Sequence, residues 1–168
     1  MTWLVEISEL NTLPCREFTR ALQPLFEAAG PLGQPLCARR PYASYSVLLD
    51  EAAVLAADLP REQQIELVNA HPRIGADPAT VSELSYREQG YAAEESDELA
   101  GVYEQLRELN GQYEERFGFR FVVFVNRRPK SAIVDVLRQR LSGSPDEELR
   151  TALHDMLEIA RARLRTLS

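Results

Sequence analysis

His71 is the better placed of the two histidines in this 168-residue chain for acid or base chemistry. Pro72 disfavours helical geometry at the residue before it, so a helix that begins at Pro60 is expected to end at Ala70 and to present His71 at its C-terminal end. His154 lies roughly 100° from the apolar stripe of its own helix at ~3.6 residues per turn, and we expect it to face solvent. The alternative for His71 is a capping residue whose imidazolium interacts with the last carbonyl groups of the helix.

A carboxylate candidate follows in segment 85–89, which reads Ser-Tyr-Arg-Glu-Gln. Glu88 could act as an acid, a base or a hydrogen-bond acceptor. The same spacing is also the capping-box pattern, in which Ser85 and Glu88 only start a helix. Thr80 and Glu83 form a competing box just upstream. Spacing alone therefore leaves both interpretations open.

Arg163 is the third candidate, because its charge falls within an apolar stripe. It lies seven residues after Met156 and four before Leu167, which places it on the apolar face of the C-terminal helix. A guanidinium there needs an anion, which a substrate could supply. The alternatives are a side chain that reaches water along the edge of the core, or one that pairs with an internal acid.

Helical periodicity dominates the elements that must position these residues. Ser144 and Pro145 predict the start of a helix that runs almost to the C-terminus, since they supply an N-cap and a proline at the first helical position. Apolar spacing of three or four residues predicts further helices over 14–29 (bent near Pro24), 46–58, 60–70, 96–117 and 131–141. We expect an all-α, single-domain multi-helix bundle that comprises residues 1–168, since no repeat or linker divides the chain.

Two segments do not fit the helical pattern. Residues 30–41 contain three prolines and two glycines, which predicts a loop that crosses the surface. Residues 119–125 are apolar and β-branched, which favours a strand, but nothing else in the sequence offers a sheet partner. We therefore expect an extended segment in or beside the helical core, whose backbone groups are free to meet a ligand.

Composition excludes several classes of function. The formal net charge of -7 and the absence of a basic face argue against nucleic-acid binding. Cys15 and Cys37 are too few for a disulfide framework or a zinc site, so we expect reduced thiols. No signal peptide, membrane-length apolar run or terminal peroxisomal address is apparent, and we expect a cytoplasmic protein that binds no membrane.

Three ordered motifs carry a resemblance to a known family. They are His-Pro-Arg-Ile-Gly at 71–75, Ser-Tyr-Arg-Glu-Gln at 85–89 and Phe-Gly-Phe-Arg-Phe-Val-Val at 117–123, with further similarity at 40–44 and 159–164. Their order and approximate spacing resemble those of the 2-oxo-4-hydroxy-4-carboxy-5-ureidoimidazoline (OHCU) decarboxylases. The departures are Ile74, where leucine is usual, and a short spacer between the first two motifs.

The resemblance implies an all-α homodimer that converts a small-molecule substrate, OHCU, to (S)-allantoin and CO2 in urate degradation, without metal or organic cofactor. By resemblance, His71 and Glu88 are catalytic. Substrate-binding roles fall on Pro72, Ser85, Gln89, Phe121, Val122, Val123, Phe124, Val125 and Arg163.

The chemistry of OHCU suits these residue types. Its carboxylate lies on a ring carbon beside an imine, so loss of CO2 can send electrons into the C=N bond without a borrowed electron sink. An enol-like intermediate then needs one proton on one face, and our hypothesis is that His71 delivers it while Glu88 orients the ring. Two other functions stay open, namely a helical protein-binding module without catalysis and a decarboxylase of a related ureido or imidazoline acid. A nucleophilic Cys15 is disfavoured, since it has no companion base in the sequence.

Overall fold

The computed structural model describes residues 3–75, 88–89 and 99–168, and these are helical apart from their connections and one extended segment. Within these ranges no strand occurs, so the predicted all-α class is confirmed. None of the helices that they contain is both long enough and apolar enough to cross a membrane.

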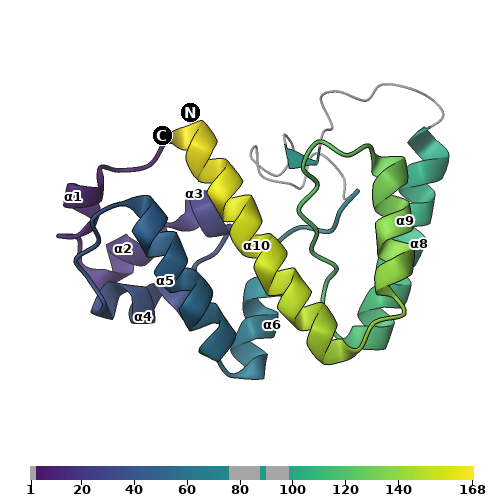
Figure 1. Cartoon of the computed structure of the whole chain (residues 1–168), viewed down its shortest axis with the longest axis horizontal. Coiled ribbons are helices and arrows are strands. Elements are labelled where there is room, and N and C mark those ends of the chain that lie inside the picture. The colour runs from purple at the N-terminus through teal and green to yellow at the C-terminus, as the bar shows by residue number, and fades with distance from the viewer. Residues whose placement is uncertain (1–2, 76–87, 90–98) are drawn as a thin grey trace.

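The long helix α10 (Pro145–Leu167) runs through the middle of the molecule and separates two groups of elements (Figure 1). One group precedes residue 70 and the other follows residue 99. The first group comprises α1 (Ile7–Leu10), α2 (Cys15–Ala21), α3 (Gln23–Phe26), α4 (Gly30–Ala38), α5 (Tyr45–Asp58) and α6 (Arg61–Asn69). The second comprises α8 (Leu99–Phe117), α9 (Lys130–Arg140) and the extended segment that joins them.

The start of α10 follows from its local sequence. The Ser144 side chain caps the helix by accepting a hydrogen bond from the backbone N–H of Glu147 at 3.3 Å. Pro145 occupies the first turn, where a missing N–H costs nothing. Both features were predicted from the sequence and are confirmed.

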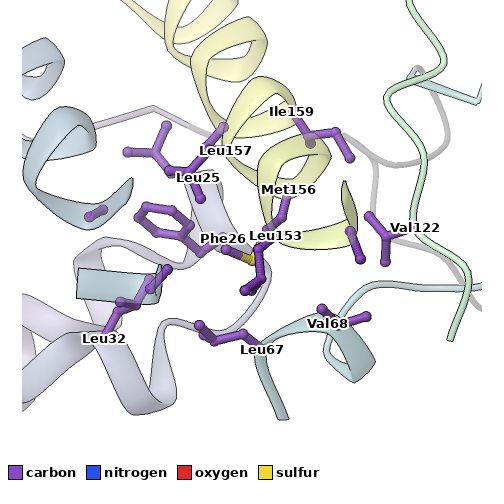
Figure 2. Close-up of a cluster of buried hydrophobic side chains, with 14 of the residues drawn as sticks. Leu25, Phe26, Leu32, Leu67, Val68, Val122, Leu153, Met156, Leu157 and Ile159 are labelled. Carbon is purple, nitrogen blue, oxygen red and sulfur yellow. The ribbon is translucent and has the colours of Figure 1, made fainter. Parts of the chain in front are cut away.

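The apolar stripe of α10 forms the centre of the core. Its buried residues include Leu153, Met156 and Leu157, and the helix packs against α3, α5 and α6. Figure 2 shows these side chains against Leu25 and Phe26 of α3. Burial of this stripe fixes the rotation of α10, and with it the direction in which Arg163 points.

Other predicted helices agree closely with the structure. Helices α5, α6 and α9 begin and end within about one residue of the predicted bounds. Helix α8 ends at Phe117, as predicted, while the predicted N-cap Ser96 lies outside the described residues. His154 is exposed on α10, with 72% of its side chain accessible, as its position on the helix predicted.

The prediction for residues 14–41 is wrong in two places. The first helix is interrupted at Leu22 and resumes as α3, with Pro24 in its first turn, before ending at Phe26. Residues 30–38 are helix α4 instead of a surface loop. Proline is tolerated in a first turn, and burial of Leu32 and Leu36 stabilises the helix despite the interior Pro35.

Cys15 and Cys37 form a disulfide between α2 and α4, so the prediction of reduced thiols is wrong. Their Cα atoms lie 5.6 Å apart, within the range that a disulfide requires. The two helices approach closely because Gly33 of α4 has no side chain to strike Thr19 of α2. The close packing of α2 against α4 brings together two cysteines that are 22 residues apart in sequence. Amino-acid composition could not indicate this contact.

Candidate functional site

A cavity of about 960 Å³ lies between α10, the end of α6 and the extended segment. Its walls contain the imidazole of His71 and the carboxylate of Glu88, the two groups that sequence could not bring together. Every predicted site residue that the structure describes lines it: His71, Pro72, Glu88, Gln89, Phe121, Val122, Val123, Phe124, Val125 and Arg163. Ser85 lies outside the described residues.

His71 follows the C-terminal end of α6 and is only 3% exposed. Its Nδ1 lies 3.4 Å from the backbone oxygen of Leu67, while its buried Nε2 has no hydrogen-bond partner among the described residues. Burial, together with the positive charge of Arg163, lowers the pKa of His71 to about 4. The imidazole is therefore neutral at pH 7, and with Nδ1–H directed at Leu67 its lone pair lies on Nε2.

Glu88 is held by a two-pronged interaction with Arg163. Arg163 Nε lies 2.6 Å from Glu88 Oε1, and Arg163 Nη2 lies 3.0 Å from Glu88 Oε2. Burial raises the pKa of Glu88 above its ordinary value, while the guanidinium opposes that rise. This bidentate geometry fixes the orientation of the carboxylate.

Arg163 is 2% exposed and makes hydrogen bonds from all three guanidinium nitrogens. Besides Glu88, it contacts Glu27 Oε1 at 2.7 Å and the backbone oxygen of Pro24 at 3.2 Å. The sequence left open whether the anion near Arg163 is a substrate or an internal acid. In this structure the anions that contact Arg163 are two internal acids, Glu27 and Glu88.

Gln89 fixes the backbone that follows the histidine. Its Oε1 accepts a hydrogen bond from Gly75 N at 2.9 Å, and its Nε2 lies 3.4 Å from the oxygen of Arg73. Lys130 is buried and donates to the backbone oxygen of Gln89. Asn110 donates to Ile74 O at 3.0 Å. These contacts connect two of the sequence motifs physically.

Gly75 is needed where this connection is made. It adopts a φ of +76°, which side chains other than glycine rarely allow, and a Cβ there would lie 3.2 Å from Leu106. A glycine at the end of the first motif thus lets the chain turn tightly beside α8.

The extended segment is confirmed, but several of its backbone groups are occupied by the protein itself. Arg140 donates to Val122 O at 2.7 Å, and Phe124 N donates to Asp155 at 3.0 Å. Arg128 donates to Phe124 O at 2.6 Å and to Val125 O at 3.0 Å. The expectation of free backbone groups is therefore wrong for these four atoms. Side chains replace the sheet partner that the segment lacks.

A buried polar network supports Arg140. Glu148 accepts hydrogen bonds from Arg140 Nε at 2.8 Å and from the hydroxyl of Tyr113 at 2.8 Å. The Tyr113 ring also contacts Phe121, with centroids 5.3 Å apart. The network links α8, α9 and α10 and supports the extended segment, which forms one wall of the cavity.

Arg120 joins the extended segment to the end of α6. Its side chain donates to the backbone oxygens of Asn69 at 2.8 Å and of His71 at 3.1 Å. Its backbone N–H donates to the Asn69 side chain at 3.0 Å. The position of His71 therefore depends on a residue of the third sequence motif.

Sequence reasoning did not identify four residues that position the site: Glu27, Lys130, Arg140 and Asp155. None carries a local signal, because each contacts a partner far along the chain. Glu27 lies 136 residues from Arg163, and Lys130 lies 41 residues from Gln89.

The arrangement combines a neutral base, a fixed carboxylate and largely apolar walls. An imidazole lone pair at Nε2 can accept a proton and return it within the same cavity. Apolar walls strengthen each electrostatic interaction that a bound polar ring makes. Such a site suits proton transfer on a small, polar, ring-shaped substrate.

Residues 11–165 match the OHCU decarboxylase family. The chain is 33% identical over 161 residues to the uric acid degradation bifunctional protein PucL of Bacillus subtilis, covering 94% of this chain and 32% of that protein. It is 32% identical over 159 residues to the 2-oxo-4-hydroxy-4-carboxy-5-ureidoimidazoline decarboxylase of Haloferax volcanii, covering 94% and 93% respectively. The chain thus spans about a third of the bifunctional relative and most of the stand-alone one.

Two solved structures share the fold. A crystal structure of OHCU decarboxylase in the presence of (S)-allantoin matches with a TM-score of 0.70 at 19% identity, covering 87% of this chain and 95% of that chain. A crystal structure of (S)-allantoin synthase matches with a TM-score of 0.70 at 22% identity, covering 96% and 53%. These likenesses concern the arrangement of the helices.

Proposed function

The chain belongs to the OHCU decarboxylase family, and we propose that it converts OHCU to (S)-allantoin and CO2 in urate degradation. It is a carboxy-lyase that acts on a small molecule. The observation that carries the proposal is the shared cavity: His71 and Glu88 arise from separate motifs, yet both line the same pocket. Their types match the proton chemistry that this decarboxylation requires.

The bond-breaking step needs an electron sink, and the substrate provides one. When the bond to the carboxylate breaks, its electron pair forms a C=C bond within the ring. The imine pair moves onto nitrogen, which takes up one proton from the solution. CO2 leaves, and the product of this step is an enol. We expect no metal or organic cofactor, because the imine performs the role that a cofactor would otherwise supply.

Proton transfer by His71 completes the reaction. With its lone pair on Nε2, the neutral imidazole accepts the proton of the ring hydroxyl as the enol becomes a carbonyl. The same nitrogen then delivers a proton to the adjacent ring carbon. Because His71 is held at one wall of the cavity, delivery comes from one face and gives one enantiomer.

The remaining predicted residues bind and orient the substrate in this proposal. Glu88, fixed by Arg163, accepts hydrogen bonds from the ring or its hydroxyl. Pro72, Ser85 and Gln89 surround the ring, as the resemblance implies. Backbone groups of residues 121–125 that have no partner among the described residues bind the ureido group.

A coupled assay tests the proposal. Urate oxidase and hydroxyisourate hydrolase generate OHCU in place, and circular dichroism follows the (S)-allantoin formed. Adding the protein should accelerate the appearance of the (S) enantiomer over the spontaneous reaction. An unchanged rate would reject the proposal and favour the alternative of a helical binding module.

Substrate identity within the class needs a second comparison. A decarboxylase of a related ureido or imidazoline acid would use the same cavity and the same two groups. Chiral product analysis across several such acids distinguishes this alternative, since OHCU should be turned over fastest. A faster reaction with another acid would reassign the substrate without changing the reaction type.

Assembly and location extend the proposal. We propose that residues 1–168 form one domain, which the family match over 11–165 and the packing of α10 against α3, α5 and α6 support. The resemblance supports a homodimer in the cytoplasm. Light scattering of the purified protein tests the dimer, which a mass near the 19.0 kDa of one chain would reject.

A further inference from the structure

Glu27 lies outside the predicted motifs, yet it contacts Arg163, the residue that holds Glu88 at the cavity. Its carboxylate lies 2.7 Å from Arg163 Nη2, the same nitrogen that binds Glu88 at 3.0 Å. One guanidinium nitrogen thus joins two acids from segments 61 residues apart in sequence. Glu27 is absent from the described cavity lining, and its hydrogen bond to Arg163 connects it to a residue of that lining.

The backbone at Glu27 adopts a conformation that side chains rarely take. Its φ is +62° and its ψ is -58°, and Ala28 N donates to Phe26 O at 2.7 Å across it. These values define a γ-turn of the rare, strained kind. Strain of this sort persists only where the surrounding structure holds it, and it is concentrated at functional sites.

The packing around this turn explains how the strain is held. Phe26 on one side is completely buried, and Ala29 on the other is 2% exposed. Figure 2 places Phe26 among the core side chains of α10. Pro24 of the same short helix also accepts a hydrogen bond from Arg163. Helix α3 and the turn that follows it therefore bind the Arg163 guanidinium through Pro24 and Glu27.

We propose that Glu27 is a positioning residue of the decarboxylase reaction, which holds Arg163 so that Arg163 presents the Glu88 carboxylate to the substrate. The inference rests on the proposed function. Without Glu27, the guanidinium keeps its charge but loses one of the contacts that set its orientation. Glu88 then loses its fixed direction, and misplacement of a catalytic group by a small distance lowers turnover strongly.

Two substitutions separate the carboxylate from the backbone turn. Glu27→Gln keeps the length of the side chain and removes its charge. Glu27→Gly removes the side chain and relieves the strain of a positive φ, which offsets part of the cost of removing one acid from a buried ion pair. Its circular dichroism spectrum reports whether the variant is folded. Glu62→Gln is the matched control, since Glu62 is an exposed glutamate in the first turn of α6.

Both Glu27 variants should lower kcat by about 10-fold to 100-fold with little change in KM, while Glu62→Gln leaves both unchanged. A merely structural role predicts full activity for a Glu27→Gly variant whose circular dichroism spectrum is that of the folded protein. If both Glu27 variants keep kcat within about twofold of the unchanged protein, the inference is wrong.

NMR titration of the histidine ring gives a readout that loss of folding does not produce. The charge of Glu27 raises the pKa of His71, against the lowering by burial and by Arg163. Glu27→Gln should therefore move the His71 titration to lower pH, whereas the control Glu62→Gln should leave the His71 titration in place. An unmoved His71 titration would contradict the placement of the Glu27 carboxylate beside Arg163 and His71. Absence of turnover by the protein without substitutions would reject only the proposed function.

Discussion

Replacing Arg163 with methionine should destabilise the fold strongly, because it leaves Glu27 and Glu88 without their shared cation. Arg163 is 2% exposed, and its partner Glu88 has 24% of its side chain accessible. Removing one partner of a buried ion pair typically costs about 3–5 kcal/mol. We expect Arg163→Met to reduce the free energy of unfolding by an amount in this range.

A surface pair provides the control. Arg61 binds Asp146 at 2.8 Å, with 46% and 81% of the two side chains exposed. Exposed pairs contribute roughly 0–1 kcal/mol, so Arg61→Met should have little effect. Urea unfolding followed by circular dichroism measures both variants with the disulfide intact.

The loss in Arg163→Met should also depend on pH. Burial already raises the pKa of Glu88, and the substitution removes the guanidinium that opposes this rise. An acid whose folded pKa is raised stabilises the fold below its unfolded pKa, and that contribution is lost as pH rises through the folded pKa. The loss should therefore be larger at pH 8 than at pH 5. A loss as small as that of Arg61→Met, or one that does not grow with pH, would refute this reasoning.

Two further predictions concern the packing of α2 against α4. Gly33→Ala should lower the free energy of unfolding by about 1–3 kcal/mol, because its Cβ would collide with the Thr19 side chain. Thermal melts should show a lower melting temperature. An unchanged melting temperature would mean that α2 and α4 can move apart without cost. Cys15→Ser should cost about 3 kcal/mol, because the bond to Cys37 closes a separation of 22 residues. Dithiothreitol should lower the melting temperature of the unchanged protein and leave that of the variant unaffected, and an equal effect on both would contradict the role of the bond.

Elements governed by neighbouring residues could be predicted from the sequence. The start of α10 depends on Ser144 and Pro145, and the end of α6 depends on Pro72, all within one helical turn of the feature that they determine. The exposed position of His154 followed from helical spacing alone. Features of this kind depend only on residues within a short stretch of sequence.

Features that depend on distant partners could not be predicted. Proline and glycine content indicated a loop where α4 forms, because the burial of Leu32 and Leu36 against other helices outweighs local preference. The disulfide and the contact between Glu27 and Arg163 likewise arise only once the chain has folded. The shared cavity of His71 and Glu88 became visible only in three dimensions.

The most direct test of the account compares the two histidines by turnover. His71→Asn and His154→Asn remove the same ring from the cavity and from the exposed face of α10 respectively. In the coupled assay, His71→Asn should lose about 10² to 10⁴ in kcat while its circular dichroism spectrum stays that of the folded protein. His154→Asn should retain full activity. Near-normal formation of (S)-allantoin by His71→Asn would contradict the central claim that this buried imidazole transfers the proton.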